Sequence, residues 1–162
     1  MGTTRFVLTP NAAEFPATNF PALTLVNRRP ALAFDAATSE SGFWTLAVPQ
    51  GWTGTVTAVI QYIMASATSG GVAFDVAVEA FTPGDAVDLD AATSFDTVNA
   101  GNDATVPGTA GYLDVVTVTL ANLDSAAVGD YLRLSVARDV ADAADTATGD
   151  CYVLSCEIRD GA

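Results

Sequence analysis

The chain has 162 residues, half of them hydrophobic, and its 19 acidic residues against six basic ones give a net charge of −13. This length fits one domain with a single core, and the hydrophobic share excludes a wholly disordered chain. The negative charge disfavours nucleic-acid binding. Because the chain has neither histidine nor lysine, histidine-based triads, histidine-ligated metal sites and Schiff-base chemistry are excluded.

The first 29 residues contain three prolines, at positions 10, 16 and 21, and the tripeptide Phe-Pro-Ala occurs twice. Proline favours extended backbone and removes hydrogen-bond donors. We therefore predict an extended N-terminal arm over residues 1–29, which either grips a neighbouring subunit or packs along its own domain. The segment lacks the apolar run of a secretory signal, and no stretch of the sequence predicts a membrane span.

Residues 30–162 show the alternation of apolar and polar residues that is typical of β-strands, with proline- and glycine-rich turns between them. The pattern predicts eight strands: Ala31–Phe34, Phe43–Val48, Thr55–Met64, Val72–Phe81, Ser94–Val98, Tyr112–Ala121, Tyr131–Arg138 and Cys151–Arg159. Eight antiparallel strands predict an all-β sandwich, with a jelly roll as the first choice. An immunoglobulin-like sandwich is the alternative, but the Cys–Trp–Cys spacing of that fold is absent.

Two of these strands carry apolar residues on both faces. Val59 and Ile63 lie on the otherwise polar face of Thr55–Met64, and the strand Tyr112–Ala121 is apolar on both sides. Large exposed apolar surface marks interfaces, and closed homo-oligomers are the commonest way to bury it. The sequence therefore favours a homo-oligomer over a monomer in which loops cover these faces.

Two alanine-rich segments, Ala86–Thr93 and Val140–Asp145, are candidates for short helices, although a loop is the simpler interpretation of both. Aspartates cluster in the same two regions, in the sequences GDAVDLDAA and RDVADAADTATGD. Calcium prefers such oxygen ligands, but neither loop has the spacing of an EF-hand. We interpret both as solvated loops and predict no metal.

The two cysteines, Cys151 and Cys156, lie in one predicted strand, roughly 16 Å apart and on opposite faces. They cannot bridge each other, so we predict free thiols. Trp44 and Trp52 flank a turn, where they either enter the core or stack on a sugar. The serines have no base partner, and no phosphate-binding loop or nucleophile elbow is present, so we predict a protein that is not an enzyme and needs no cofactor.

A resemblance to small virion proteins of tailed bacteriophages is carried by three stretches, NRRPALAFDAATSESGFWTLAVPQGWTGTVTAVIQYIMASATSG, TVPGTAGYLDVVTVTL and AAVGDYLRLSVARDVADAADTATGDCYVLSCEIRD. The likeness covers most of the chain after Asn27 and is one of strands and turns. These proteins are often jelly rolls and include capsid decoration, or cement, proteins. The resemblance implies a homotrimer on the lattice of the major capsid protein, at the virion surface, after synthesis in the host cytoplasm.

Capsid decoration is accordingly our first hypothesis, with partner binding assigned to Phe6, Phe15, Phe20, Arg28 and Arg29. The alternative is a tail-fibre or spike domain that binds a host glycan through loop aromatics such as Trp52 and Tyr112. A glycan hydrolase that uses paired carboxylates is the remote alternative. The scarce arginines are expected to pair with carboxylates, within the subunit or across a subunit boundary.

Overall fold

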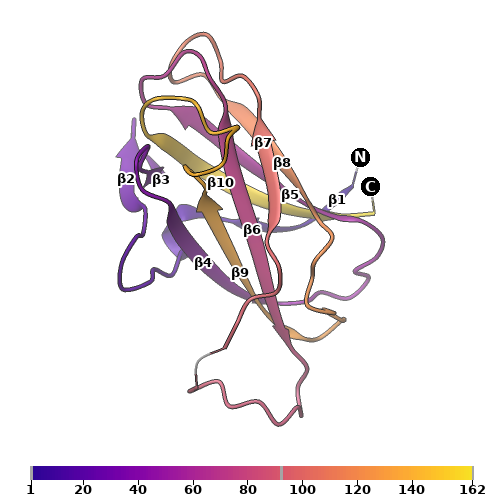
Figure 1. The fold of residues 1–162 in the computed structure, drawn as a ribbon. Helices are drawn as coiled ribbons and strands as arrows, with labels where there is room; N and C mark the ends of the chain where they lie inside the picture. Colours follow the sequence, from indigo (N-terminus) through magenta and orange to yellow (C-terminus); the bar gives the residue numbers. More distant parts are fainter. Residues whose placement is uncertain (1, 92, 162) are drawn as a thin grey trace.

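The fold is a sandwich of two antiparallel sheets, shown in Figure 1 as a computed structural model that describes residues 2–91 and 93–161. Sheet A contains β1 (Thr3–Leu8), β2 (Ala22–Val26), β3 (Arg29–Phe34), β10 (Cys151–Asp160), β5 (Val56–Met64) and β8 (Asp114–Leu120). Sheet B contains β4 (Glu40–Ala47), β9 (Tyr131–Arg138), β6 (Val72–Phe81) and β7 (Asn99–Asp103). The predicted all-β sandwich is confirmed.

The core lies between the two sheets and is built from the alternating apolar residues of the strands. In β9, for example, Leu132, Leu134 and Val136 are buried, while the residues between them are partly exposed. Phe34 of sheet A meets Phe74 of sheet B edge to face, with ring centroids 5.7 Å apart. Period-two alternation in the sequence is therefore the cause of the two-layer architecture.

Seven of the eight predicted strands overlap strands of the structure. The prediction of Ser94–Val98 as a strand is wrong, because Phe95 in that segment instead stacks on Phe43 of β4. The strand β7 follows at Asn99–Asp103, and its Gly101 permits a close approach to β8, since an added Cβ would lie 2.8 Å from Val118 Cγ2. No helix forms among the described residues of Ala86–Thr93 and Val140–Asp145; residue 92 lies outside them.

The N-terminal segment packs along its own domain, the second of the two arrangements predicted for residues 1–29, and contributes strands to sheet A instead of remaining a separate arm. Strand β1 pairs with the second half of β10, and β2 pairs with β3. Between them, η1 (Pro10–Ala12) is a 3-10 helix. No helix among the described residues is long and apolar enough to cross a membrane. The boundary predicted between residues 29 and 30 falls at the start of β3, so deletion of residues 1–29 would remove two strands of sheet A.

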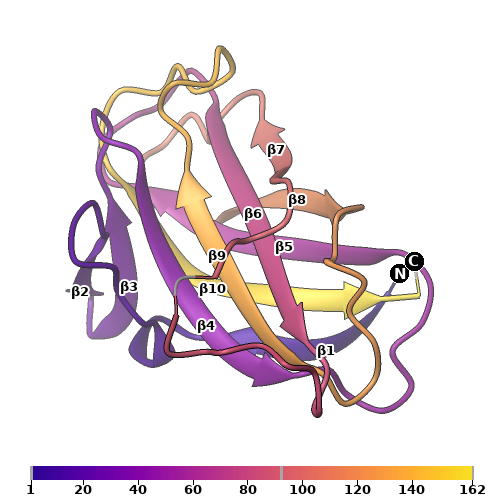
Figure 2. The ribbon, with the colours of Figure 1, turned by 60° about the horizontal axis from the view of Figure 1, so that its bottom comes forward.

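The sandwich is closed along one side by strands, whereas along the other the segment between β1 and β2 bonds to the edge of β4, where Glu14 and Phe43 exchange backbone hydrogen bonds. Strands β7 and β8 lie against each other, and the Tyr62 hydroxyl of β5 donates a 2.6 Å hydrogen bond to Asp103 of β7 across this closed side. On this second side, β2 is the last strand of sheet A and lies at the margin of the molecule in both ribbon views (Figures 1 and 2).

Candidate functional site

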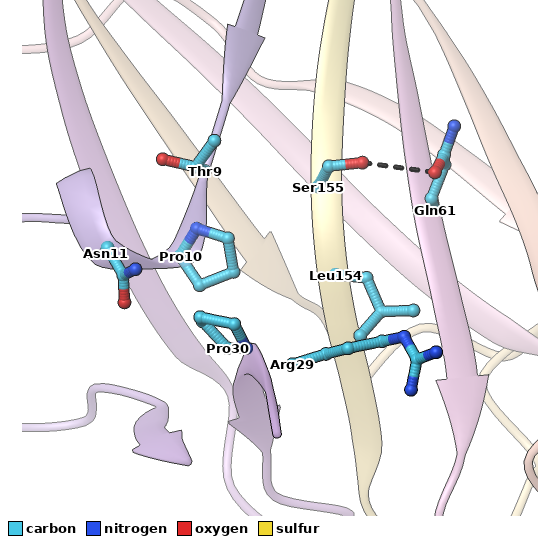
Figure 3. Close-up of a pocket in the computed structure, with 8 residues that line it drawn as sticks. All are labelled: Thr9, Pro10, Asn11, Arg29, Pro30, Gln61, Leu154 and Ser155. Atoms are coloured by element: carbon cyan, nitrogen blue, oxygen red, sulfur yellow. Dashed lines mark hydrogen bonds between the residues drawn. The ribbon is translucent and has the colours of Figure 1, made fainter. Parts of the chain in front are cut away.

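A groove crosses the outer face of sheet A, the face turned away from sheet B. Its first hollow, of about 380 Å³, is shown in Figure 3 and is lined by Thr9, Pro10, Asn11, Arg29, Pro30, Gln61, Leu154 and Ser155. A second hollow of about 370 Å³ is lined by Val26, Asn27, Arg29, Ile63, Gly111, Leu113 and Leu154. Because Arg29 and Leu154 line both hollows, we treat them as one site, the sheet A groove.

Local sequence explains how Arg29 reaches this groove. The β2–β3 hairpin has a two-residue turn, Asn27-Arg28, and both residues have positive φ, 46° and 69°. This combination is that of a type I′ turn, whose twist matches the strands it joins. The turn places Arg29 as the first residue of β3, and its side chain extends past Leu154 of β10 (Figure 3).

Arg29 has no carboxylate partner among the described residues, although the chain carries 19 acidic side chains. The only hydrogen bond from its side chain to a described residue goes to the backbone carbonyl of Asn27, at 3.3 Å. Its neighbour Arg28 is exposed and forms no ion pair with a described residue. The hairpin tip is thus a local positive charge on a strongly negative protein, which suits an anionic or carbonyl-bearing partner.

A network of polar side chains borders the groove on β5 and β10. Gln61 Nε2 donates to Glu157 Oε1 at 3.0 Å, and Ser155 donates to Gln61 Oε1 at 3.2 Å. Hydrogen bonds from Arg159 and Thr4 to Glu157 hold the pKa of that carboxyl below its usual range. These groups are already satisfied by one another, and the Ser155 hydroxyl meets an amide rather than a base, so the arrangement can bind but offers no activated nucleophile.

The outer face of sheet B carries a second, smaller pocket of about 140 Å³, whose polar groups are incompletely paired. Glu79 is 2% exposed, and its Oε1 lies 3.4 Å from Arg133 Nη1. Glu79 Oε2 and Arg133 Nε are both buried without a hydrogen-bond partner among the described residues. Arg133 also lies over the ring of Phe43, 4.6 Å from its centroid. A carboxylate oxygen and an N–H left unpaired at one pocket can together receive and donate hydrogen bonds to a polar ligand.

The five residues predicted to bind a partner lie in three separate places. Phe6 packs beside Trp52 against the core, with ring centroids 6.1 Å apart, and therefore has a structural role. Phe15 and Phe20 form an exposed pair, 5.6 Å apart, ahead of β2. Arg28 and Arg29 lie at the opposite end of β2. The structure thus does not bring these residues into one patch.

The remaining candidates are placed as follows. Trp44 is buried in the core and donates its indole N–H to the Thr9 carbonyl, whereas Tyr112 is well exposed. Cys151 and Cys156 are free, as predicted, but both lie in the core rather than on opposite faces, because the register of β10 shifts between Val153 and Ser155. Burial raises the pKa of the Cys156 thiol to about 12. Within the described residues, no three acidic or cysteine side chains gather closely enough to hold a metal ion.

The predicted arginine pairing is correct for four of the six arginines. Arg5, Arg133, Arg138 and Arg159 each lie within 4 Å of a carboxylate. The partner of Arg138 is Asp145, which reaches back from within the acidic loop. Leu154, Gln61 and Glu79 could not be predicted as site residues, because a side chain on a strand's outer face becomes part of a site only through the strands beside it.

The fold is similar to that of a carbohydrate-binding module, CBM35 from Cellvibrio japonicus Abf62, with a TM-score of 0.50 and 11% identity over 97% of this chain and 94% of that chain. A Paenibacillus sp. cycloisomaltooligosaccharide glucanotransferase, complexed with cycloisomaltoheptaose, aligns with a TM-score of 0.41 and 10% identity over 93% of this chain and 19% of that chain. The first likeness supports the jelly-roll sandwich fold. No family profile and no curated protein sequence matches the chain.

Proposed function

We propose that the protein is a non-catalytic binding protein that decorates the head shell of a tailed bacteriophage and docks on the shell through the sheet A groove. The observation that carries the proposal is Arg29, an arginine without a carboxylate partner among the described residues, placed beside the apolar side chains of Leu154, Ile63 and Leu113. Such a surface fits an acidic and apolar segment of a protein lattice. The choice of a phage shell as that lattice comes from the sequence resemblance.

Binding of this kind stabilises a shell without any chemical step. A protein that binds the assembled lattice and not its dissociated subunits shifts the assembly equilibrium by mass action. Many copies on one particle retain the layer even when each contact is weak. The net charge of −13 would also limit the sticking of decorated particles to nucleic acid.

The test is co-sedimentation of the purified protein with phage heads that lack it. We expect Arg29→Ala to weaken binding about tenfold, equivalent to ~1.4 kcal/mol, because one charge-assisted hydrogen bond is lost. Arg159→Ala removes the same charge from a residue that already pairs with Glu157, and should change binding much less. Equal binding by the wild type and Arg29→Ala would remove the groove from the mechanism.

A second candidate function, the binding of a host glycan, is favoured by the pocket on sheet B. The unpaired Glu79 Oε2 can accept from a sugar hydroxyl, and Arg133 Nε can donate to one. The similarity of the fold to a carbohydrate-binding module supports the same candidate. A glycan array tests it: binding that Glu79→Gln weakens would support this function, and an array without signal would dismiss it.

A further inference from the structure

The outer edge of β2 has unpaired backbone hydrogen-bonding groups. Val26 and Arg29 flank a two-residue turn, so they form a hydrogen-bonded pair, and the pattern alternates along the hairpin. Thr24 therefore directs its backbone N–H and C=O toward β3, whereas Leu23 and Leu25 direct theirs away from the sheet. No strand of the described residues lies on that side of β2. Such an edge is a template for pairing with another strand.

The side chains of this edge are also unusually apolar for an exposed strand. Leu23 pairs with the core residue Leu32 and so points to the core side of sheet A, yet it is 51% exposed and Leu25 is 68% exposed. Phe20, which precedes the strand, is 44% exposed. Exposed apolar groups that adjoin unpaired backbone groups indicate an interface.

We propose that β2 pairs antiparallel with β2 of a second copy of this chain, about a two-fold axis at Thr24. This register places Leu23 opposite Leu25 of the second copy, so that the outward-facing backbone groups of both residues bond across the axis. It also places Phe20 opposite Arg28 of the second copy. Arg28 has no carboxylate partner among the described residues, and a guanidinium on an aromatic ring is a favourable contact.

A second copy fits this edge because the sequence of the strand is complementary to itself under that rotation. The four leucines would form one apolar cluster on the core side of a sheet that runs through both copies. Pro21 has no N–H, so the ladder stops there and the pairing is short. Each copy carries a charge of −13, so we expect the association to strengthen as salt screens the repulsion.

The pairing uses the outer edge of β2, whereas the proposed shell binding depends on Arg29 of β3, although Val26 and Asn27 of the same hairpin also line the groove. It predicts a dimer, in contrast to the homotrimer implied by the resemblance. Sedimentation of the full chain over a wide range of concentration is the first measurement. A monomer–dimer equilibrium is expected, whereas a monomer at every concentration or a trimer would overturn the proposal.

A cysteine at the two-fold axis tests the register. In Thr24→Cys, the two new thiols would face each other at a non-hydrogen-bonded pair, where Cα atoms lie about 4.5 Å apart, within the range of a disulfide. In the control Val26→Cys, the two thiols would lie roughly 14 Å apart along the strands. The native Cys151 and Cys156 are buried, so cross-linked dimer from the wild type should be negligible. Under mild oxidation, at least tenfold more dimer is expected from Thr24→Cys than from Val26→Cys; equal yields would refute the register.

Charge substitutions test the leucine contacts without relying on a disulfide. Leu23→Glu with Leu25→Glu places like charges opposite each other and should abolish the dimer. Leu23→Lys with Leu25→Glu places opposite charges across the axis and should restore it. Both residues are more than half exposed, so circular dichroism should show an unchanged fold. Dimerisation of the all-glutamate variant, or its loss in the Lys/Glu variant, would contradict the proposed pairing.

Discussion

The β9–β10 loop, residues 139–150, and the β2–β3 hairpin use their arginines in opposite ways. Arg138 is fully buried and holds the loop: it binds both carboxylate oxygens of Asp145, at 2.8 and 2.9 Å, and donates to the backbone carbonyls of Ala147 and Gly149. Arg28 and Arg29 at the hairpin are exposed and pair with no carboxylate of the described residues.

This difference separates residues that stabilise the fold from residues available for recognition. A buried arginine must be paired, since an unpaired charge in the core is costly. An exposed arginine loses little by having no partner, but in a chain of net charge −13 it concentrates the few positive charges at one place. The contrast therefore predicts large effects on stability in the loop and large effects on binding at the hairpin.

Replacement of the buried arginine should have the largest effect. Arg138→Met leaves the carboxylate of Asp145 buried without its counter-charge, so we expect a loss of about 3–5 kcal/mol in the free energy of unfolding, measured with urea. Arg159→Met, which breaks a partly exposed pair with Glu157, is the control and should lower the free energy of unfolding by less than about 1 kcal/mol. Similar losses in the two variants would contradict the structural role given to Arg138.

The closed side of the sandwich should respond next most strongly. Tyr62→Phe removes the hydroxyl that donates to Asp103 between β5 and β7, and we expect a loss of about 1–3 kcal/mol in the free energy of unfolding. Tyr112→Phe makes the same chemical change at a well-exposed tyrosine and should lie within about 0.5 kcal/mol of the wild type. A large effect of Tyr112→Phe would show that this tyrosine makes a contact that the single chain lacks.

At the hairpin we expect a gain in stability together with a loss of association. Arg28 occupies the left-handed region, with φ of 69°, where a residue other than glycine costs about 1 kcal/mol. Arg28→Gly should therefore raise the free energy of unfolding by up to that amount, while weakening the β2 dimer. Arg28→Asn, which tolerates the same φ better than arginine but lacks its charge, separates the two effects. A loss of stability in both variants would contradict the assignment of Arg28 to recognition.

The sequence predicted the layers of this molecule better than its sites. Alternation identified Val72–Phe81 and Tyr131–Arg138 to the residue, since one face of each strand is buried by its own sandwich. Strands β1 and β2 were not predicted, because the prolines that lie between them made the whole N-terminal segment resemble an extended arm. Arg29 was found because arginine is rare in this chain. Glu79 was not found, because its burial depends on strands distant in the sequence.

The smallest effects should come from the two ion pairs on β10, whose arginines are partly exposed, and a change of pH reveals them. A hydrogen bond from Arg5 lowers the pKa of Asp160, and bonds from Arg159 and Thr4 lower that of Glu157. Carboxyl groups with lowered pKa stabilise the fold above their usual titration range, and this stability is lost as pH falls through the lowered values. Glu40 and Asp75 act in the opposite direction, because burial raises their pKa.

We therefore expect the melting temperature to fall as the pH is lowered below the range in which carboxyl groups usually titrate. The fall should be shallower in Asp160→Asn, which no longer titrates at this position. Asp75→Asn removes a group whose raised pKa favours the folded state on acidification, so its melting temperature should fall more steeply than that of the wild type. The same pH slope in all three proteins would show that the pairs seen on β10 do not contribute to stability. Acidification also lowers the negative charge of both copies, so, like added salt, it should strengthen the dimer for as long as the fold persists.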